Sequence, residues 1–407
     1  MKARSLLRQG LVNLFKHFPL AFLANVFYGW PAKKLKVIGV TGTDGKTTTV
    51  SLIYHLLKEV GLSSAMVSTV SAKIKNEEID TGFHVTEPNP WELQKLLRRM
   101  VNEGINYVVL EVSSHGLDQY RDFGIAYEVG VVTNITHDHF DYHKNYKNYL
   151  TAKARLFEKS KISVLNKDDQ SFNYLTAKIK SKTITYSLKS AADFTLKKFP
   201  FKTALPGEFN QYNCLAAIAA ASALGVSEKK IKEAVSLFKG VTGRMEEINE
   251  GQNFKAIVDF ASTPNSLEQA LIALRKQLKK GARLIAVFGS AGLRDIEKRS
   301  MMGEISAKYA DLSVLTAEDP RTEDVNKIIE QIAEGCRTNN GIEGKTFFKI
   351  PDRQEAIIFA IQKLAKPNDI VVTCGKGHER SMCIGTTEYP WNEQEAVKKA
   401  LKERINK

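Results

Sequence analysis

Residues Lys36–Gly61 read KVIGVTGTDGKTTTVSLIYHLLKEVG, and this stretch decides the fold class of the chain. It opens with Lys36–Val40, a short apolar run with β-branched residues that predicts a buried strand. A glycine-containing loop follows. Apolar residues then recur at helical spacing from Thr48 to Gly61, where the glycine favours the end of a helix. Strand, loop and helix in this order predict a ligand site at the loop of an α/β sheet.

The loop Thr41–Thr47 has the composition of a phosphate-binding loop. Loop N–H groups and the helix N-terminus bind phosphate, Lys46 supplies a positive charge, and Thr47 can hold magnesium. The pattern G-x-x-x-x-G-K-[ST] is not met, because Val40 stands at its first position and Gly42 gives only G-x-x-G-K-T. An ordinary glycine turn is the alternative, but the flanking strand and helix favour the phosphate site.

The alternation of strands and helices continues along the chain. A helix is predicted at 91–104, and further buried strands at 107–112, 129–134, 162–166, 256–260, 284–288, 312–316 and 369–373. This pattern predicts an α/β protein with a P-loop-type, parallel-sheet ATPase domain at 36–240. We expect a Rossmann-like domain at 241–407, and a separate helical segment at 1–35.

The composition is that of a soluble globular protein. Of 407 residues, 43% are hydrophobic and 26% are charged, so a large core is available without disulfide or metal staples. The net charge of +14 favours acidic partners, although a solvated lysine-rich surface is the simpler explanation. Four cysteines without a C-x-x-C pair argue against structural zinc and fit a reducing cytoplasm. Because aromatic and basic residues do not interleave, we expect no nucleic-acid partner. We also expect a monomer.

The N-terminal residues 1–35 need their own interpretation. Phe18–Ala32 is free of charge and contains Pro19, but it is shorter than the ~20 residues that span a bilayer. No small-residue cleavage site follows, as a signal peptide would require. Upstream, cations mix with apolar residues as in a basic amphipathic helix, namely Lys2, Arg4, Arg8 and Lys16 among Leu6, Leu7, Leu11, Leu14 and Phe15. The segment 1–32 either docks on the protein's own core or contacts the inner membrane surface of the cytoplasm.

Two polar segments follow predicted strands, where ligands of parallel sheets bind. Glu111 ends one strand, and a carboxylate there suits magnesium, with a surface carboxylate as the alternative. The segment 134–143, NITHDHFDYH, carries His137, His139 and His143. Three imidazoles from one short loop rarely converge on one transition metal. A single histidine beside a magnesium–phosphate site is therefore the preferred interpretation.

Together these motifs resemble the Mur ligases, which add amino acids to the peptidoglycan precursor. The first half contributes TGTDGKTTT at 41–49, EVSSHGL at 111–117, the histidine segment at 134–143 and YLTAK at 149–153. The second half contributes LPGEFN at 205–210 with Asn213, GRME at 243–246, VDFASTP at 258–264, Arg294-Asp295 with Lys298-Arg299, EDPR at 318–321 and GKGHE at 375–379. In order and spacing they are similar to the MurE subgroup, which adds the third residue of the stem peptide.

The resemblance implies a ligase that uses ATP and magnesium and forms an amide bond through an acyl phosphate. Residues that match ATP contacts are Gly42, Thr43, Asp44, Gly45, Lys46, Thr47 and Thr48, with Asn213 for adenine and Asp259 for ribose. Two magnesium ions are implied, with Thr47, Glu111, His139 and a carbamylated Lys153 as ligands. Arg244 matches the residue that reaches the γ-phosphate across the domain hinge. Lys46, Lys153, Arg244 and His139 are thus the implied catalytic residues.

The resemblance also implies a muramyl-peptide acceptor and an amino acid of the diaminopimelate or lysine type. Thr86, Ser113, Gln119 and Arg121 are the candidate acceptor residues. Arg321, Gly375 and Glu379 match positions that grip a diaminopimelate side chain, and Asp319 stands in the same specificity string as a further candidate substrate residue. A bidentate guanidinium on a carboxylate is the physical reason for Arg321.

Four positions depart from the family pattern. Asp44 replaces asparagine in the phosphate loop, Glu87 interrupts a Thr-Thr-Pro loop, and Ser262 replaces histidine. Asp319 replaces the asparagine of Asp-Asn-Pro-Arg, and its charge favours lysine over diaminopimelate as the added amino acid. Family members also carry a uridine-binding domain before the phosphate loop, where this sequence has residues 1–35. An acceptor without UDP, such as a lipid-linked peptide, is therefore an alternative.

Two further readings belong to other classes of function. A ligase that extends another peptide or polyglutamate would share the phosphate loop, but not the strings around Arg321 and Glu379. A non-catalytic scaffold descended from a ligase is opposed by the intact set of Lys46, Glu111 and Lys153. ATP hydrolysis that depends on both an amino acid and an acceptor separates these readings.

Overall fold

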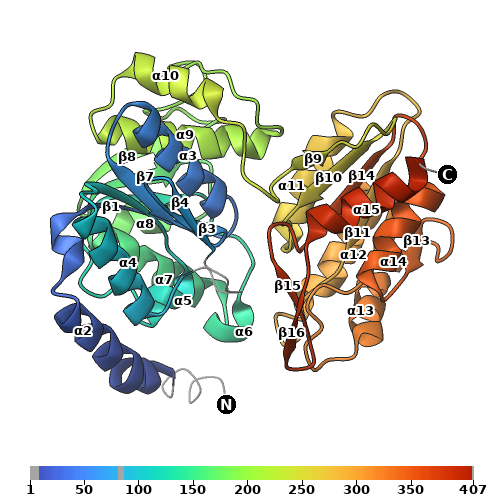
Figure 1. Cartoon of the computed structure of the whole chain (residues 1–407), viewed down its shortest axis with the longest axis horizontal. Coiled ribbons are helices and arrows are strands. Elements are labelled where there is room, and N and C mark those ends of the chain that lie inside the picture. Colours follow the sequence, from blue (N-terminus) through green and yellow to red (C-terminus); the bar gives the residue numbers. More distant parts are fainter. Residues whose placement is uncertain (1–8, 81–86, 406–407) are drawn as a thin grey trace. The chain divides into compact units, whose positions relative to one another are not determined.

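The computed structural model describes residues 9–80 and 87–405, which divide into two units (Figure 1). Unit 1 comprises Met1–Thr136, Tyr142–Leu205 and Phe209–Lys239. Unit 2 comprises His137–Asp141, Pro206–Glu208 and Gly240–Lys407. The loop that follows the third predicted strand is thus grouped with unit 2.

The described part of unit 1 contains an eight-stranded sheet in the order β4-β3-β2-β5-β1-β6-β7-β8. Its strands are β1 (Lys36–Thr41), β2 (Ser64–Val67), β3 (Ser71–Ile74), β4 (Glu77–Asp80), β5 (Tyr107–Glu111), β6 (Tyr127–Val132), β7 (Ser160–Asn166) and β8 (Lys182–Tyr186). The six strands β2, β5, β1, β6, β7 and β8, taken across the sheet, pair in parallel. At the β4 edge, β3 is antiparallel to both β2 and β4. β1 lies between β5 and β6, so the loop after β1 lies at the centre of the sheet.

Helices cover both faces of this sheet, as expected for parallel strands joined by crossovers. Figure 1 shows α3, α9 and α10 on one side and α4, α5 and α7 on the other. The helices of unit 1 are α2 (Phe18–Phe27), α3 (Lys46–Glu59), α4 (Pro90–Asn102), α5 (Ser114–Asp118), α7 (Tyr146–Glu158), α8 (Phe172–Lys178), α9 (Glu208–Ala223) and α10 (Glu228–Leu237). A π-helical turn η1 (Asn13–His17) precedes α2, a 3-10 turn η2 (Pro31–Lys34) precedes β1, and α6 (Phe140–His143) follows the histidine loop.

In the described part of unit 2, a six-stranded sheet has the order β13-β12-β11-β14-β10-β9. Its strands are β9 (Glu246–Ile248), β10 (Lys255–Asp259), β11 (Leu284–Phe288), β12 (Leu312–Leu315), β13 (Phe347–Lys349) and β14 (Ile370–Cys374), with a separate hairpin of β15 (Ser381–Ile384) and β16 (Thr387–Pro390). Only β9 pairs antiparallel within the larger sheet. Helices are α11 (Pro264–Arg275), α12 (Glu297–Tyr309), α13 (Val325–Thr338), α14 (Arg353–Ile358), the π-helical η3 (Phe359–Leu364) and α15 (Glu393–Ile405).

The core of unit 2 forms between its sheet and the last helices. Strand residues such as Val258 and Val287 pack with Ile357 of α14 and Val397 of α15 in one buried cluster. The α/β fold class is confirmed, and every predicted strand is present within about two residues, the usual uncertainty of element ends. Both sheets are mostly parallel as predicted, and β3, β4 and β9 run antiparallel at their edges.

Candidate active site

The phosphate loop joins β1 to α3, and its two glycines have backbone conformations that side chains disfavour. Gly45, with φ of 81°, caps α3, and a Cβ there would lie 2.3 Å from Oδ1 of Asn213. A Cβ on Gly42 would lie 1.9 Å from Oγ1 of Thr133. Within the loop, Lys46 Nζ donates to the carbonyl oxygen of Thr43 at 2.8 Å. The loop therefore packs tightly against its neighbours while α3 offers its N-terminus to a ligand.

Glu111 ends β5 beside the start of α3. Its Oε2 accepts a hydrogen bond from Thr47 Oγ1 at 2.9 Å, and its Oε1 accepts one from Thr69 Oγ1 at 2.8 Å. The predicted magnesium ligands Thr47 and Glu111 are therefore brought together. Their oxygen atoms are the donors that magnesium prefers, so these two residues fit the ion.

Lys153 of α7 is buried beside the phosphate loop. Its Nζ donates to the carbonyl oxygen of Gly42 at 2.6 Å and lies 4.6 Å from the centre of the Tyr149 ring. Tyr149 in turn links to the loop, because its hydroxyl lies 3.1 Å from Thr43 Oγ1. An unmodified ammonium at this place contacts the loop as a cation and cannot serve as a metal ligand.

Asn213 of α9 lies against the same loop. Its side chain is buried, donates from Nδ2 to Oδ1 of Asn210 at 3.0 Å, and accepts from Thr49 Oγ1 at 3.4 Å. On the other side of the loop, the backbone N–H of Asp44 donates a hydrogen bond to Asn134 Oδ1 at 3.0 Å. The predicted nucleotide residues of unit 1 are thus one connected group, although their contacts with ATP stay predictions.

Glu87 joins the predicted acceptor residues Ser113, Gln119 and Arg121. Ser113 donates from its backbone N–H and from Oγ to Glu87 Oε2, at 3.3 and 3.2 Å. Arg121 Nη1 donates to the backbone oxygen of Glu87 at 2.7 Å, and Arg121 Nη2 donates to Oε1 of Gln119 at 2.8 Å. Burial, with a smaller effect of the Asp122 charge, raises the pKa of the Glu87 carboxyl to about 8. Thr86 lies outside the described residues.

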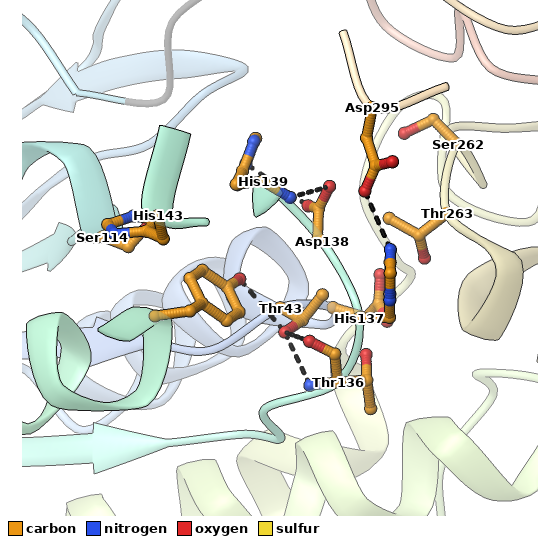
Figure 2. A network of polar contacts seen from close by, with 12 residues as sticks. Thr43, Ser114, Thr136, His137, Asp138, His139, His143, Ser262, Thr263 and Asp295 are labelled. Carbon is orange, nitrogen blue, oxygen red and sulfur yellow. Dashed lines mark hydrogen bonds and ion pairs between the residues drawn. The ribbon is translucent and has the colours of Figure 1, made fainter. Parts of the chain in front are cut away.

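The three histidines of the 134–143 segment have different partners. In unit 2, His137 Nε2 lies 2.8 Å from Asp295 Oδ2, and His139 Nε2 lies 3.3 Å from Asp138 Oδ2 (Figure 2). In unit 1, His143 Nε2 lies 3.0 Å from Ser114 Oγ. Among the described residues, the three imidazoles therefore do not share one metal site, and the role of His139 stays a prediction.

Arg244 and Asp259 lie at one end of the unit 2 sheet. Asp259 accepts from the N–H groups of Met245 and Ala261, at 2.7 and 2.8 Å. The Arg244 guanidinium lies over the Phe260 ring, 4.3 Å from its centre. Burial and the Arg244 charge lower the pKa of the neighbouring His378 to about 3, so its imidazole is neutral at pH 7.

The predicted amino-acid residues of unit 2 meet around Lys376, which has no exposed surface. Its Nζ lies 2.8 Å from Asp319 Oδ1 and 2.5 Å from Glu379 Oε2. Asp319 Oδ1 also accepts the N–H of Cys383, and the N–H of Arg321 donates to the Cys383 carbonyl. Asp319 and Glu379 therefore share one buried cation, which offsets part of their negative charge. This pairing weakens the reason for expecting a preference for lysine.

Two further charged residues border this group. Arg294 is partly buried, and burial together with the Arg321 charge lowers the pKa of its guanidinium. Glu318 faces Gly375, where a Cβ would lie 2.8 Å from its Oε2, and burial raises the pKa of its carboxyl. Lys376, Arg294 and Glu318 belong to motifs that resemble the family, but the sequence predicted no role for these three residues. Buried pairing of this kind has no signature in a single sequence.

Comparison with known proteins decides the family. The model for the Mur ligase middle domain matches residues 40–221, and the model described as "Mur ligase, glutamate ligase domain" matches residues 243–377. The chain belongs to the Mur ligase family. As a Mur ligase it is an ATP-dependent amino-acid ligase, and the family's use of ATP and magnesium agrees with the oxygen ligands beside its phosphate loop.

Individual Mur ligases and their relatives agree with this assignment. A UDP-N-acetylmuramoyl-L-alanyl-D-glutamate–2,6-diaminopimelate ligase of Clostridium acetobutylicum is 37% identical over 404 residues, covering 94% of this chain and 82% of the relative. A solved structure of a ligase with the same activity in its name is 32% identical, with a TM-score of 0.61, covering 92% of this chain and 80% of the other. The folylpolyglutamate synthase of Mycobacterium tuberculosis has a TM-score of 0.71 at 14% identity, over 88% of this chain and 92% of the other, and shows the shared fold alone.

Proposed function

We propose that this Mur ligase joins 2,6-diaminopimelate to a muramyl peptide ending in D-glutamate, in the cytoplasm. The arrangement of charged residues around Lys376 is the main support for this proposal. Lys376 offsets part of the charge of Asp319, and the nearby Arg321 and Arg294 supply guanidinium groups for a carboxylate. Glu379, which shares the Lys376 ammonium with Asp319, adds a carboxylate for the ammonium group of a substrate. Diaminopimelate carries both groups at the end of its side chain, whereas lysine carries only the ammonium.

The acceptor is proposed to bind in unit 1. Ser113, Gln119 and Arg121 supply donors to a peptide carboxylate, and Glu87 holds two of the three in place. The acceptor carboxylate attacks the γ-phosphorus of ATP, the bond to the β-phosphate oxygen breaks, and ADP leaves. The amine of the amino acid then attacks the acyl carbon and releases phosphate, with loss of one proton from nitrogen. Both steps gather negative charge on oxygen, so cations and N–H groups dominate catalysis.

The chain's own residues have separate tasks in this proposal. Lys46 and the N-terminus of α3 bind the phosphates, and Arg244 neutralises charge on the transferred phosphoryl group. Asn213 and Asp259 bind adenine and ribose. Magnesium, held by Thr47 and Glu111, would polarise phosphate oxygens. We further propose a second ion with His139 and a carbamylated Lys153 as ligands, since carbamylation would turn a buried cation into an oxygen donor.

The reaction class is tested by leaving out one substrate at a time. ADP release is expected only when ATP, diaminopimelate and UDP-N-acetylmuramoyl-L-alanyl-D-glutamate are all present. If ADP is released at the same rate without the amino acid, the protein is not a ligase that forms this bond. Replacing the acceptor by its lipid-linked counterpart in the same assay tests the alternative acceptor. Arg321→Gln should raise the KM for the amino acid, leaving the KM for ATP unchanged.

A further inference from the structure

The N-terminal helix Gln9–Phe27 has one face docked on unit 1. Asn13 Nδ2 donates to Asp118 Oδ2 at 2.8 Å, and Asn25 Nδ2 donates to the backbone oxygen of Phe123 at 2.8 Å. Between them, the Phe18 ring lies 4.9 Å from the Phe123 ring, measured between centres. These contacts fix the orientation of the helix and therefore decide which side chains point outward.

The opposite face of the helix is apolar and exposed. Phe15 is 73% exposed, Phe27 71% and Leu23 54%. The other large apolar residues that are exposed on this helix are Leu11, Val12, Leu14, Leu20, Phe22 and Val26. Contiguous apolar surface of this kind marks a site of interaction. By length and composition alone, this 19-residue helix would also qualify as a membrane span.

The charged residues that flank this face in the sequence have one sign. No acidic residue occurs in the sequence before Asp44. Lys16 on the helix, and Lys33, Lys34 and Lys36 after it, are all exposed. An apolar helix face flanked in the sequence by cations complements an anionic lipid surface, because apolar burial and electrostatic attraction both contribute to binding. A second copy of the chain would bring like charges together.

We propose that this face binds an anionic bilayer, with Gln9–Phe27 lying in the plane of the interface. A spanning orientation would require the helix to give up its contacts with Asp118 and Phe123. The segment that the helix docks on also contains Gln119 and Arg121, so the proposed acceptor residues would lie beside the membrane. This inference is independent of the identity of the added amino acid.

The experiment uses the full chain and vesicles of phosphatidylcholine with or without phosphatidylglycerol. Co-sedimentation should be at least about tenfold stronger with the anionic lipid, and high salt should weaken it. Brominated lipids should quench the tryptophan fluorescence of a Trp391→Phe variant, which retains Trp30, just before η2, and Trp91, whose ring centre lies 5.4 Å from that of Phe27. The double variant Phe15→Glu/Leu23→Glu should lose binding. The matched control Leu237→Glu changes a residue of α10 that is 58% exposed, and it should bind like the parent.

The outcomes distinguish the possible occupants of the face. Failure of the parent to bind anionic vesicles overturns the proposal, as does equal loss of binding in Leu237→Glu. A concentration-dependent dimer that Phe15→Glu/Leu23→Glu abolishes, without vesicle binding, would assign the face to a second copy instead. Thermal unfolding verifies that each variant is folded. ADP release with soluble substrates in the absence of lipid reports on the proposed function separately.

Discussion

At Glu87, a carboxyl group occupies a space that only glycine at position 116 leaves open. A Cβ on Gly116 would lie 1.6 Å from Glu87 Oε2. Enclosure raises the pKa of this carboxyl to about 8, so the folded protein retains a proton there that the unfolded chain loses above its ordinary pKa of 4.5. Because the unfolded state then binds fewer protons, this group lowers the free energy of unfolding as the pH rises from 4.5 to about 8.

Glu87→Gln removes this titration but keeps the shape of the side chain. Relative to the parent, the variant should gain stability as the pH rises through this window, by up to about 1.4 kcal/mol per pH unit. Urea unfolding of both proteins at several pH values measures the difference. A stability difference that stays constant with pH would contradict the assignment of the proton to Glu87.

Lys376 allows a second prediction at the scale of one residue. Lys376→Met leaves Asp319 and Glu379 without their shared buried cation, which should cost about 3–5 kcal/mol of stability. Asp319→Asn is the matched control, because it leaves the pair of Lys376 with Glu379 intact. Urea unfolding and the KM for the amino acid should both change more in Lys376→Met. Equal effects would show that Lys376 does not organise this group.

At the scale of elements, the junction of β1 and α3 depends on Gly45. Gly45 and Gly61 have the same φ of 81°, but only a Cβ on Gly45 meets a neighbour, Asn213. Gly61→Ala should therefore cost about 1 kcal/mol from backbone strain alone. Gly45→Ala should cost more and weaken ATP binding by at least about tenfold, because the loop must shift away from phosphate. Calorimetric ATP titration measures this, and unchanged ATP affinity in Gly45→Ala would contradict the proposed phosphate site.

The eight strands that the sequence predicts were recognisable because their signals are local. The β-branched run before the loop predicts β1, and the spacing after it predicts α3. The antiparallel strands β3 and β4 were missed because four-residue strands carry too little alternation to be recognised. The partners of Lys376 and Glu87 were missed for another reason. Glu87 contacts Ser113 across 26 residues and Lys376 contacts Asp319 across 57, and only Glu379 lies close in sequence, three residues after Lys376.

At the scale of the whole molecule, the proposed tasks divide between the two units. Unit 1 contains the phosphate loop and the proposed acceptor residues, and unit 2 contains the proposed amino-acid residues. The family assignment covers both, because its two domain models match residues 40–221 and 243–377. The excess of cations, +14 over the chain, fits the phosphates and carboxylates of every proposed substrate.

The most direct test of the central claim is a competition between diaminopimelate and lysine in one reaction with ATP and UDP-N-acetylmuramoyl-L-alanyl-D-glutamate. Mass spectrometry distinguishes the two products. At equal concentrations of the two amino acids, the ratio of product amounts gives the ratio of their kcat/KM values. Pairing of Asp319 with Lys376 predicts that diaminopimelate is favoured by at least about 100-fold, since an unmatched guanidinium and a missing carboxylate contact together oppose lysine. A product mixture dominated by the lysine adduct would contradict the account.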